Sequence, residues 1–286
     1  MRAIVAPVYN VQTVYQTCTN SINDVVLGAR LNMVTNNVVL AAQDYYQKAA
    51  AKKLYLIPPN NSHNDDIVVG AVTKQELKDV YSVHFVGRTK PARVFYDQLL
   101  SNAPLGRCPF CGFGHASTLD HYLPKTTFPL VAVVPHNLVP ACKDCNTGKG
   151  TAIAITEEAQ YLHPYFDHQH FVSEQWLYAE VEPTVPANIR FYVTPPQHWD
   201  DVSKNRVQSH FNDFKLSARY SVEASNQLAC LRDTLVTYHE MLGVDGVKQH
   251  LEIEARSNFR LHSNSWQTAM FQALAASNWY CNGGFN

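Results

Sequence analysis

Two Cys-x-x-Cys pairs constrain the fold of this chain more than any other feature. Cys108 and Cys111 form the first pair, Cys142 and Cys145 the second, and 30 residues separate them. A two-residue gap lets both thiolates of a pair bind one ion from a tight turn, so two pairs can complete a tetrahedral Zn²⁺ site. The alternative is a redox-active pair. We predict a structural Zn²⁺ ion held by all four cysteines.

The composition indicates a globular chain. Of 286 residues, 46% are hydrophobic and 16% are charged, which is typical of folded proteins. Seven cysteines, an odd number, give no indication of a disulfide framework. No apolar run reaches 18 residues, and the N-terminal segment is interrupted by polar residues and a proline. We therefore expect a cytoplasmic protein with no membrane contact.

Hydrophobic periodicity predicts mostly helical flanks. A helix is expected within residues 20–54, and the Thr73-x-x-Glu76 capping box predicts another that reaches about Val86. Thr89 is expected to cap a third, and residues 188–193 alternate like a strand. Residues 203–277 are expected to be mostly helical. The predicted division is an N-terminal helical region (1–100), a central region (101–170) and a C-terminal helical region (171–286).

The charges are distributed unevenly over a nearly neutral chain. Residues 1–150 contain 14 lysines and arginines against 9 acidic residues, whereas residues 151–286 contain 9 against 15. A basic first half favours contact with a polyanion such as nucleic acid, although solvated surface charge alone produces such differences.

The residues between and beside the cysteine pairs carry a second pattern. Asp120-His121 lies in "STLDHYLPK", Asn137 precedes "LVPAC", and Asn146 directly follows the last cysteine. In this order, and with Lys149 three residues further on, residues 108–150 resemble the HNH endonucleases, in the zinc-bound branch of the ββα-metal, or His-Me finger, nucleases.

The resemblance implies an α+β fold, with a mostly α-helical chain around a small ββα-metal nuclease core that contains the four-cysteine zinc site. The core is expected to be a hairpin of strands at about 117–122 and 130–136, packed on a helix that begins near Cys142. Successive side chains of a strand point to opposite faces. Asp120 and His121 can therefore serve one phosphate only at a bulge or at the end of a strand.

The resemblance also implies roles for the catalytic residues. His121 is the expected general base, and an oxygen of Asn137 is expected to fix its ring. Asp120 and Asn146 are the expected ligands of a catalytic Mg²⁺ or Mn²⁺ ion, since oxygen donors select hard cations. The third position of the HNH motif is Asn146 in place of histidine, which favours Mg²⁺ over softer metals.

Three lysines are candidates for contacts with substrate phosphates: Lys149, Lys125 and Lys143. Each has solvated surface lysine as its alternative interpretation. In "LHPYFDHQH", residues 162–170, we expect Leu162, Tyr165 and Phe166 to pack against the nuclease core. A position of His163 or Asp167 near the active site is the alternative.

These features predict a metal-dependent HNH endonuclease that hydrolyses phosphodiester bonds, with DNA as the expected substrate. A bacterial anti-phage effector, held inactive until a signal arrives, fits the family resemblance and leaves room for a regulatory protein partner or a homo-oligomer. The alternative is a zinc-stabilised module that binds nucleic acid or protein without catalysis. Such a module would show salt-sensitive binding and no turnover.

Overall fold

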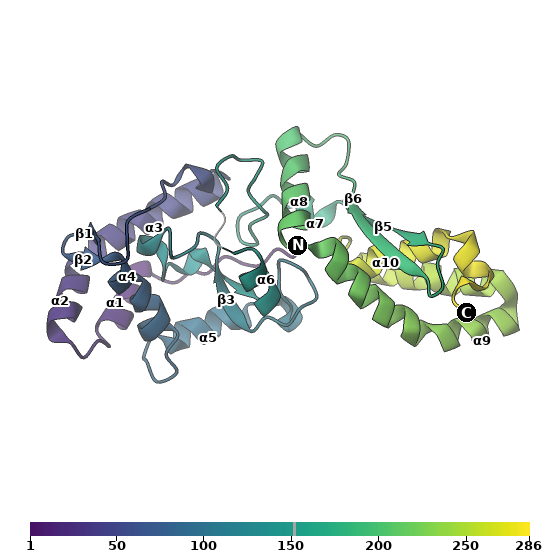
Figure 1. The fold of residues 1–286 in the computed structure, drawn as a ribbon, viewed down its shortest axis with the longest axis horizontal. Helices are drawn as coiled ribbons and strands as arrows, with labels where there is room; N and C mark the ends of the chain where they lie inside the picture. Colours follow the sequence, from purple (N-terminus) through teal and green to yellow (C-terminus); the bar gives the residue numbers. More distant parts are fainter. Residues whose placement is uncertain (151–152) are drawn as a thin grey trace. The chain divides into compact units, whose positions relative to one another are not determined.

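The computed structural model describes residues 1–150 and 153–286, and it confirms the expected α+β class. Helices surround short two-stranded antiparallel sheets (Figure 1). The chain divides into two compact units: an N-terminal unit, Arg2–Asp167, and a C-terminal unit, made of Met1 and His168–Asn286. The N-terminal unit thus contains residues 2–100 together with nearly all of the expected nuclease region.

The N-terminal unit is built from short elements. In order they are α1 (Val11–Thr19), α2 (Val25–Met33), α3 (Thr35–Ala50), η1 (Leu54–Leu56), β1 (Ile67–Val69), β2 (Val72–Thr73), α4 (Lys74–Asp79), η2 (Val80–Phe85), α5 (Arg93–Ser101), η3 (Pro104–Gly106), β3 (Thr118–His121), η4 (Pro129–Val131), η5 (Pro135–Asn137), β4 (Leu138–Ala141) and α6 (Lys143–Gly148).

Capping residues explain several helix boundaries. The predicted capping box is confirmed: Thr73 accepts from the Glu76 backbone, and the Glu76 carboxylate accepts from the Thr73 backbone. The helical character expected within residues 20–54 is confirmed, and it is divided between two helices: Asp24 caps α2, and the helix is interrupted at Val34 before α3 begins. Thr89 caps no helix, since α5 begins only after Ala92.

The central hairpin differs from the prediction in its second strand. β3 pairs with β4 in a continuous register from Thr118–Ala141 to His121–Leu138. The segment 130–136, expected to be a strand, forms the 3₁₀ turns η4 and η5, because Pro129 and Pro135 open them. The helix expected near Cys142 is confirmed, with Cys142 as the N-cap of α6.

One hydrophobic core joins this hairpin to the preceding helices. Leu119 of β3 and Leu138 of β4 are buried with Val14 of α1, Val38 of α3 and Leu99 of α5. Each of these side chains is at most 3% exposed. The position of β3 therefore depends on residues from the first hundred positions of the chain.

The C-terminal unit is a second α+β assembly. It contains α7 (His170–Ser173), β5 (Leu177–Glu182), β6 (Asn188–Val193), α8 (Asp201–Asp213), α9 (Leu216–Leu261), α10 (Trp266–Ala276) and η6 (Tyr280–Gly284). The predicted strand over residues 188–193 is confirmed as β6, paired with β5. The mostly helical character expected for residues 203–277 is confirmed too.

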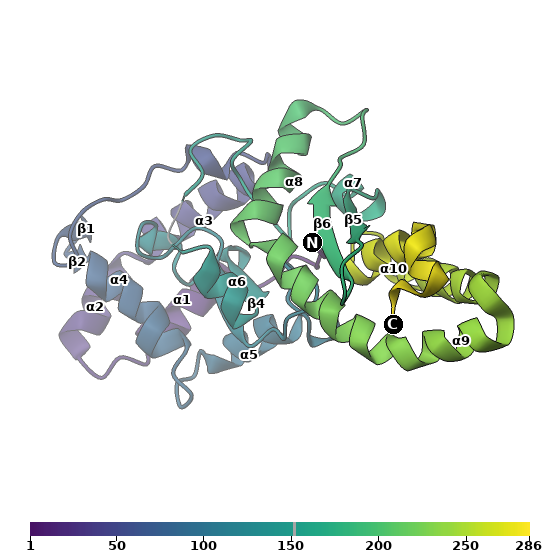
Figure 2. The ribbon, with the colours of Figure 1, turned by 45° about the vertical axis from the view of Figure 1, so that its right-hand side comes forward.

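A glycine divides the long element α9 (Figure 2). Gly243 has a φ of 68°, which only glycine adopts readily, so the helix is interrupted there. The rings of Tyr238 and His250 lie 4.6 Å apart. In a straight helix twelve residues would separate them by about 18 Å, so the two parts of α9 fold back on each other.

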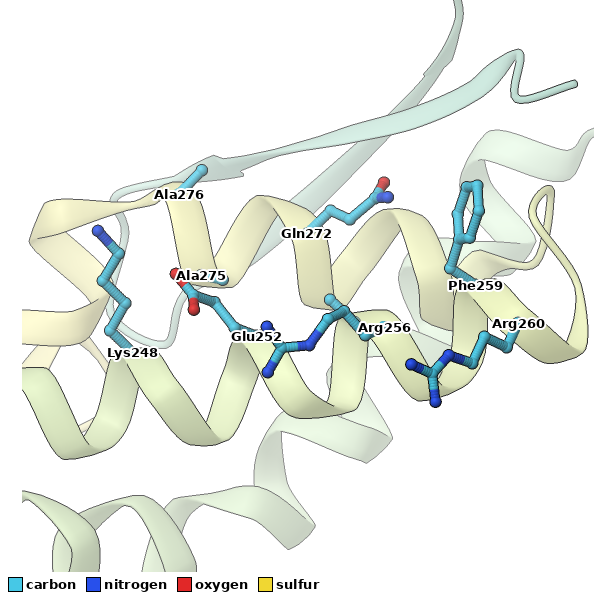
Figure 3. A pocket seen from close by; sticks show the side chains of 9 residues that line it. Lys248, Glu252, Arg256, Phe259, Arg260, Gln272, Ala275 and Ala276 are labelled. Carbon is cyan, nitrogen blue, oxygen red and sulfur yellow. The ribbon is translucent and has the colours of Figure 1, made fainter.

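A groove of about 560 Å³ runs between the second part of α9 and α10 (Figure 3). Lys248, Arg256 and Arg260 lie along its α9 side, and Ala275 and Ala276 line it from α10.

Within the described residues no single helix has the length and apolarity to cross a membrane. Helices α2 and α3 meet those two criteria only as a pair bent by 46°.

Candidate active site beside a four-cysteine cluster

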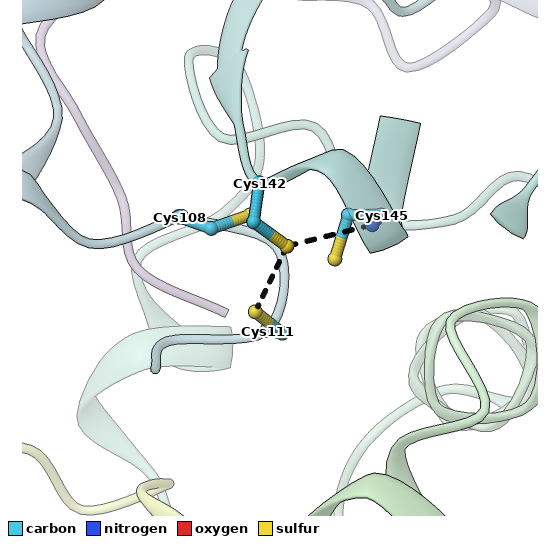
Figure 4. Close-up of side chains that lie close together, drawn as sticks. All are labelled: Cys108, Cys111, Cys142 and Cys145. Carbon is cyan, nitrogen blue, oxygen red and sulfur yellow. Dashed lines mark hydrogen bonds between the residues drawn. The ribbon is translucent and has the colours of Figure 1, made fainter. Parts of the chain in front are cut away.

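The four predicted cysteine ligands form one cluster: Cys108, Cys111, Cys142 and Cys145. Their Sγ atoms all lie within 4.8 Å of one another, and all four residues are buried. The Sγ atoms of Cys111 and Cys142 are 3.8 Å apart (Figure 4). Sulfur ligands around zinc lie about 3.8 Å apart when each Zn–S bond is about 2.3 Å. The cluster can therefore hold a metal ion such as zinc.

Local turns aim the cysteines at one point. The Cys145 amide donates to Cys142 Sγ at 3.4 Å across the first turn of α6, and the Gly114 amide donates to Cys111 Sγ at 3.4 Å. A Cβ atom on Gly114 would lie 2.8 Å from Cys142 Sγ. Such a distance is a steric clash, so the first turn needs glycine where it approaches the second pair.

The cluster joins the end of β4 to the start of α6, and α6 lies against one face of β3. Asn146 Nδ2 donates to Thr118 Oγ1 at 3.0 Å, and Lys149 Nζ lies 2.7 Å from Asp120 Oδ2. Thr118 and Asp120 therefore point towards α6, as residues two apart on a strand should. The sequence prediction that α6 carries Asn146 over the Asp120 strand agrees with this geometry.

His121 points to the opposite face at the last position of β3. Its Nε2 lies 2.8 Å from the Ala132 carbonyl oxygen, and its ring packs edge-on against Tyr81 of η2 with centroids 4.3 Å apart. His121 is 8% exposed and Asp120 is 3% exposed. The register of β3 is regular through His121, so Asp120 and His121 point to opposite faces and the convergence that one phosphate requires is not present at this strand end. Both side chains are closely covered.

Burial changes the proton affinity of this pair. It raises the pKa of Asp120 to about 6, although the Lys149 ammonium lowers it. It lowers the pKa of His121 to about 3, against the hydrogen bond to Ala132. At neutral pH His121 is therefore a neutral imidazole, the form that can accept a proton.

Asn137 has a different role from the one predicted. Its Oδ1 accepts from the Leu123 amide at 2.7 Å, and its Nδ2 donates to the carbonyls of Leu123 at 3.0 Å and Val131 at 3.1 Å. Asn137 braces the loop between β3 and β4 and does not hold the His121 ring. The Ala132 carbonyl, next to Val131 in that loop, orients the imidazole instead.

Replacing Asn137 with alanine is expected to destabilise the N-terminal unit by about 3 kcal/mol, since it leaves the buried amide and carbonyl of Leu123 without partners and removes one of two bonds to the Val131 carbonyl. Urea unfolding of Asn137→Ala beside Asn102→Ala, an exposed asparagine after α5, would measure the effect. Equal midpoints for the two variants would show that the brace contributes nothing.

The three lysines expected at the substrate differ in their positions. Lys149 is not presented to solvent: its side chain is 4% exposed and donates to the His121 carbonyl and to Tyr161 Oη, both at 2.6 Å. Lys125 donates to Ser82 Oγ at 2.6 Å. Lys143 is exposed on α6, where a phosphate contact stays a prediction.

The histidine segment after the hairpin packs as expected. Leu162 is fully buried, and Tyr165 Oη donates to the Leu138 carbonyl at 2.8 Å. His163 stacks on Tyr122 with centroids 4.1 Å apart, and its Nε2 lies 3.0 Å from Tyr45 Oη. His163 is part of this aromatic core, on which β4 and the loop after β3 rest.

Sequence reasoning missed two residues that contact the site, Tyr81 and Tyr161. Tyr81 covers His121, and Tyr161 accepts from Lys149 while donating to the Tyr122 carbonyl at 2.7 Å. Both lie about 40 residues from β3 in sequence. No spacing rule links them to Asp120-His121, so only the tertiary fold identifies them.

The oxygen atoms on this face suit a hard divalent cation. Asp120 Oδ2 is paired with the Lys149 ammonium at 2.7 Å, and Asn146, whose Nδ2 donates to Thr118 Oγ1, lies on the same face of β3 with a second oxygen donor. One or two protein oxygens, completed by waters and substrate phosphate, are the usual environment of Mg²⁺. Asp120 and Asn146 thus offer oxygen donors of the kind that Mg²⁺ binds, and their role as ligands of a catalytic ion stays a prediction.

Acidification should test the burial of His121, with Mg²⁺ and Mn²⁺ omitted. The pKa of the His121 ring is 6.5 in the unfolded chain and about 3 in the folded protein. Between these pH values the ring is protonated only in the unfolded chain, so acidification lowers the free energy of unfolding. From pH 7 to pH 4 the stability of His121→Gln should rise by about 2–3 kcal/mol relative to wild type. Urea unfolding at both pH values measures this difference, and a constant difference would contradict a buried neutral ring.

Comparisons with known proteins give one informative match. The chain is 36% identical over 223 residues to protein ea31 of Escherichia phage lambda, which covers 74% of this chain and 75% of that protein. No family model matches the sequence, and no solved structure matches it. The matched protein's name states no activity.

Proposed function

Because the chain belongs to the family of protein ea31 of Escherichia phage lambda, whose name states no activity, we propose a function from the site itself. The protein is a metal-dependent endonuclease of the HNH type that hydrolyses phosphodiester bonds, with DNA as the expected substrate. Zinc in the four-cysteine cluster is structural. An anti-phage role finds no support in a relative that belongs to a phage.

The orientation of His121 is the observation that carries the proposal. A carbonyl oxygen can only accept, so Nε2 of His121, 2.8 Å from the Ala132 oxygen, must carry the proton. Nδ1 is then the basic nitrogen. A neutral imidazole with a fixed tautomer can take a proton from an attacking water, although the burial that lowers the pKa of His121 to about 3 makes it a weaker base than a ring near its ordinary pKa. Asp120, its neighbour, lies at the same strand end and points to the opposite face, towards Lys149.

Asp120 and Asn146 would hold the divalent cation, and Thr118 supports this role by orienting the Asn146 amide. When bound, such an ion neutralises charge that develops on a phosphate in hydrolysis. The four-cysteine cluster fixes the start of α6, and thus Asn146, against β3. Lys143, exposed on α6, is available to attract a phosphate.

A cleavage assay tests the proposal directly. The purified protein is incubated with plasmid DNA, single-stranded DNA and RNA, each with Mg²⁺, with Mn²⁺ or with EDTA. We expect cleavage of DNA that depends on the added metal. Cleavage of RNA alone would change the substrate class, and no cleavage of any of the three under all conditions would refute the nuclease assignment.

A binding module without catalysis is the second candidate, favoured by the low exposure of Asp120 and His121. A general base must reach its water, and these side chains are covered by Lys149 and Tyr81. This candidate predicts nucleic-acid binding that weakens with salt, and no turnover. Fluorescence anisotropy with a labelled oligonucleotide, run beside the cleavage assay, separates the two candidates.

A further inference from the structure

Lys149 occupies the place next to Asp120 where a cation is needed. Its Nζ lies 2.7 Å from Asp120 Oδ2, and both side chains are 4% exposed. The carboxylate is therefore neutralised by the protein's own ammonium. This inference rests on the proposed function, in which Asp120 also binds the divalent ion.

The surroundings of Lys149 hold its ammonium at this position. It donates to the His121 carbonyl and to Tyr161 Oη, both at 2.6 Å, and it lies 4.9 Å above the centre of the Tyr161 ring. The contacts with Asp120 and the His121 carbonyl join the ammonium to two consecutive residues of β3. An ion pair removed from water to this extent is weakened little by salt.

A divalent ion at Asp120 and the ammonium at its present place exclude each other. Two cations on one carboxylate in a buried site repel strongly, because the surrounding dielectric constant is low. The backbone beside Lys149 has the conformational freedom of glycine. Lys149 is the C-cap of the short helix α6, and glycines flank it: Gly148, and Gly150 with a φ of 63°.

We propose that Lys149 is a built-in competitor of the catalytic metal ion, so that the divalent cation binds Asp120 only when the Lys149 ammonium leaves. Lys149 thereby sets the metal concentration at which the site fills. It is a residue that controls metal binding and does not contact substrate. When Lys149 leaves, its hydrogen bonds to the His121 carbonyl and to Tyr161 Oη are broken as well.

Metal binding to variants tests this without reference to cleavage. Zinc-loaded wild type, Lys149→Met and Lys53→Met are titrated with Mn²⁺, and free Mn²⁺ is followed by electron paramagnetic resonance. Lys149→Met should bind one Mn²⁺ at least about tenfold more tightly than wild type, because the repulsion is gone. Lys53→Met, altered at an exposed position of the same unit, should match wild type. Equal or weaker binding by Lys149→Met overturns the proposal.

The double variant Asp120→Asn/Lys149→Met identifies the ion's position. It should lose the tight Mn²⁺ site, and tight binding that persists in it would place the ion elsewhere and overturn the proposal.

A second measurement uses the wild-type chain, in case Lys149→Met does not fold. Reductive methylation followed by mass spectrometry reports which lysines reach solvent. Lys149 should be protected without Mg²⁺ and modified with saturating Mg²⁺, while Lys143 is modified in both. Lys149 that stays protected at saturation overturns the proposal. Metal exchange without nucleic-acid cleavage would refute only the proposed function, and metal-dependent cleavage with Lys149 still protected would refute only the exchange.

Discussion

Replacing His121 with alanine is expected to lower the rate of DNA cleavage by about 10²–10⁴-fold, the usual contribution of a general base. The reason is that Nδ1 is the basic nitrogen that the Ala132 hydrogen bond leaves for an attacking water. The rate is measured as conversion of supercoiled plasmid to the nicked form at saturating Mg²⁺. Mn²⁺ binding should be retained, since alanine leaves Asp120 and Asn146 in place.

The matched control is His115→Ala. His115 is an exposed histidine between the first cysteine pair and β3, and it contacts neither Asp120 nor Asn146. Its replacement should leave the cleavage rate unchanged. If His121→Ala cuts as fast as this control, while its circular dichroism and zinc content equal those of wild type, His121 is not the base.

Loss of one cysteine ligand should have the largest effect on folding. In Cys145→Ser the cluster loses a thiolate at the first turn of α6. Binding of structural zinc is worth about 10–16 kcal/mol in small zinc domains, comparable to the whole stability of a typical domain. We expect the bound zinc to fall from one ion per chain to near zero, and the N-terminal unit to unfold.

Zinc content by mass spectrometry and the far-ultraviolet circular dichroism signal check this result. Cys230→Ser is the control, because Cys230 is an exposed cysteine of α9 that lies outside the cluster. This variant should keep its zinc and its helicity. A Cys145→Ser protein with one tightly bound metal ion and a native spectrum would show that the cluster is not a four-ligand site.

Local patterns in the sequence predicted the parts of the fold that depend on neighbouring residues. The cysteine pairs form tight turns, and the bond between Thr73 and Glu76 spans three residues, so their spacing contains the necessary information. The family motif formed by Asp120-His121 and Asn146 likewise predicted that the first two lie at the end of a strand and the third on a helix. In each case the partner lies within one turn or within one matched motif.

Long-range contacts could not be predicted in this way. Asn137 braces Leu123, fourteen residues away, and the sequence does not show which backbone group an amide will meet. Lys149 lies three residues after Asn146, a position that predicts a lysine directed to substrate or solvent. In the structure Tyr161 and Asp120 enclose its side chain. The second strand was misplaced because apolar residues before Pro135 look like a strand, whereas the two prolines impose 3₁₀ turns.

The shared core of the hairpin limits how this protein can be divided or recombined. Leu119 and Leu138 complete their packing with Val14, Val38 and Leu99. A fragment starting at residue 101 would leave these two leucines facing water, with no partner helices to cover them. The β3–β4 hairpin therefore cannot be moved on its own: expression, fusion or genetic exchange would have to transfer Arg2–Asp167 as one piece.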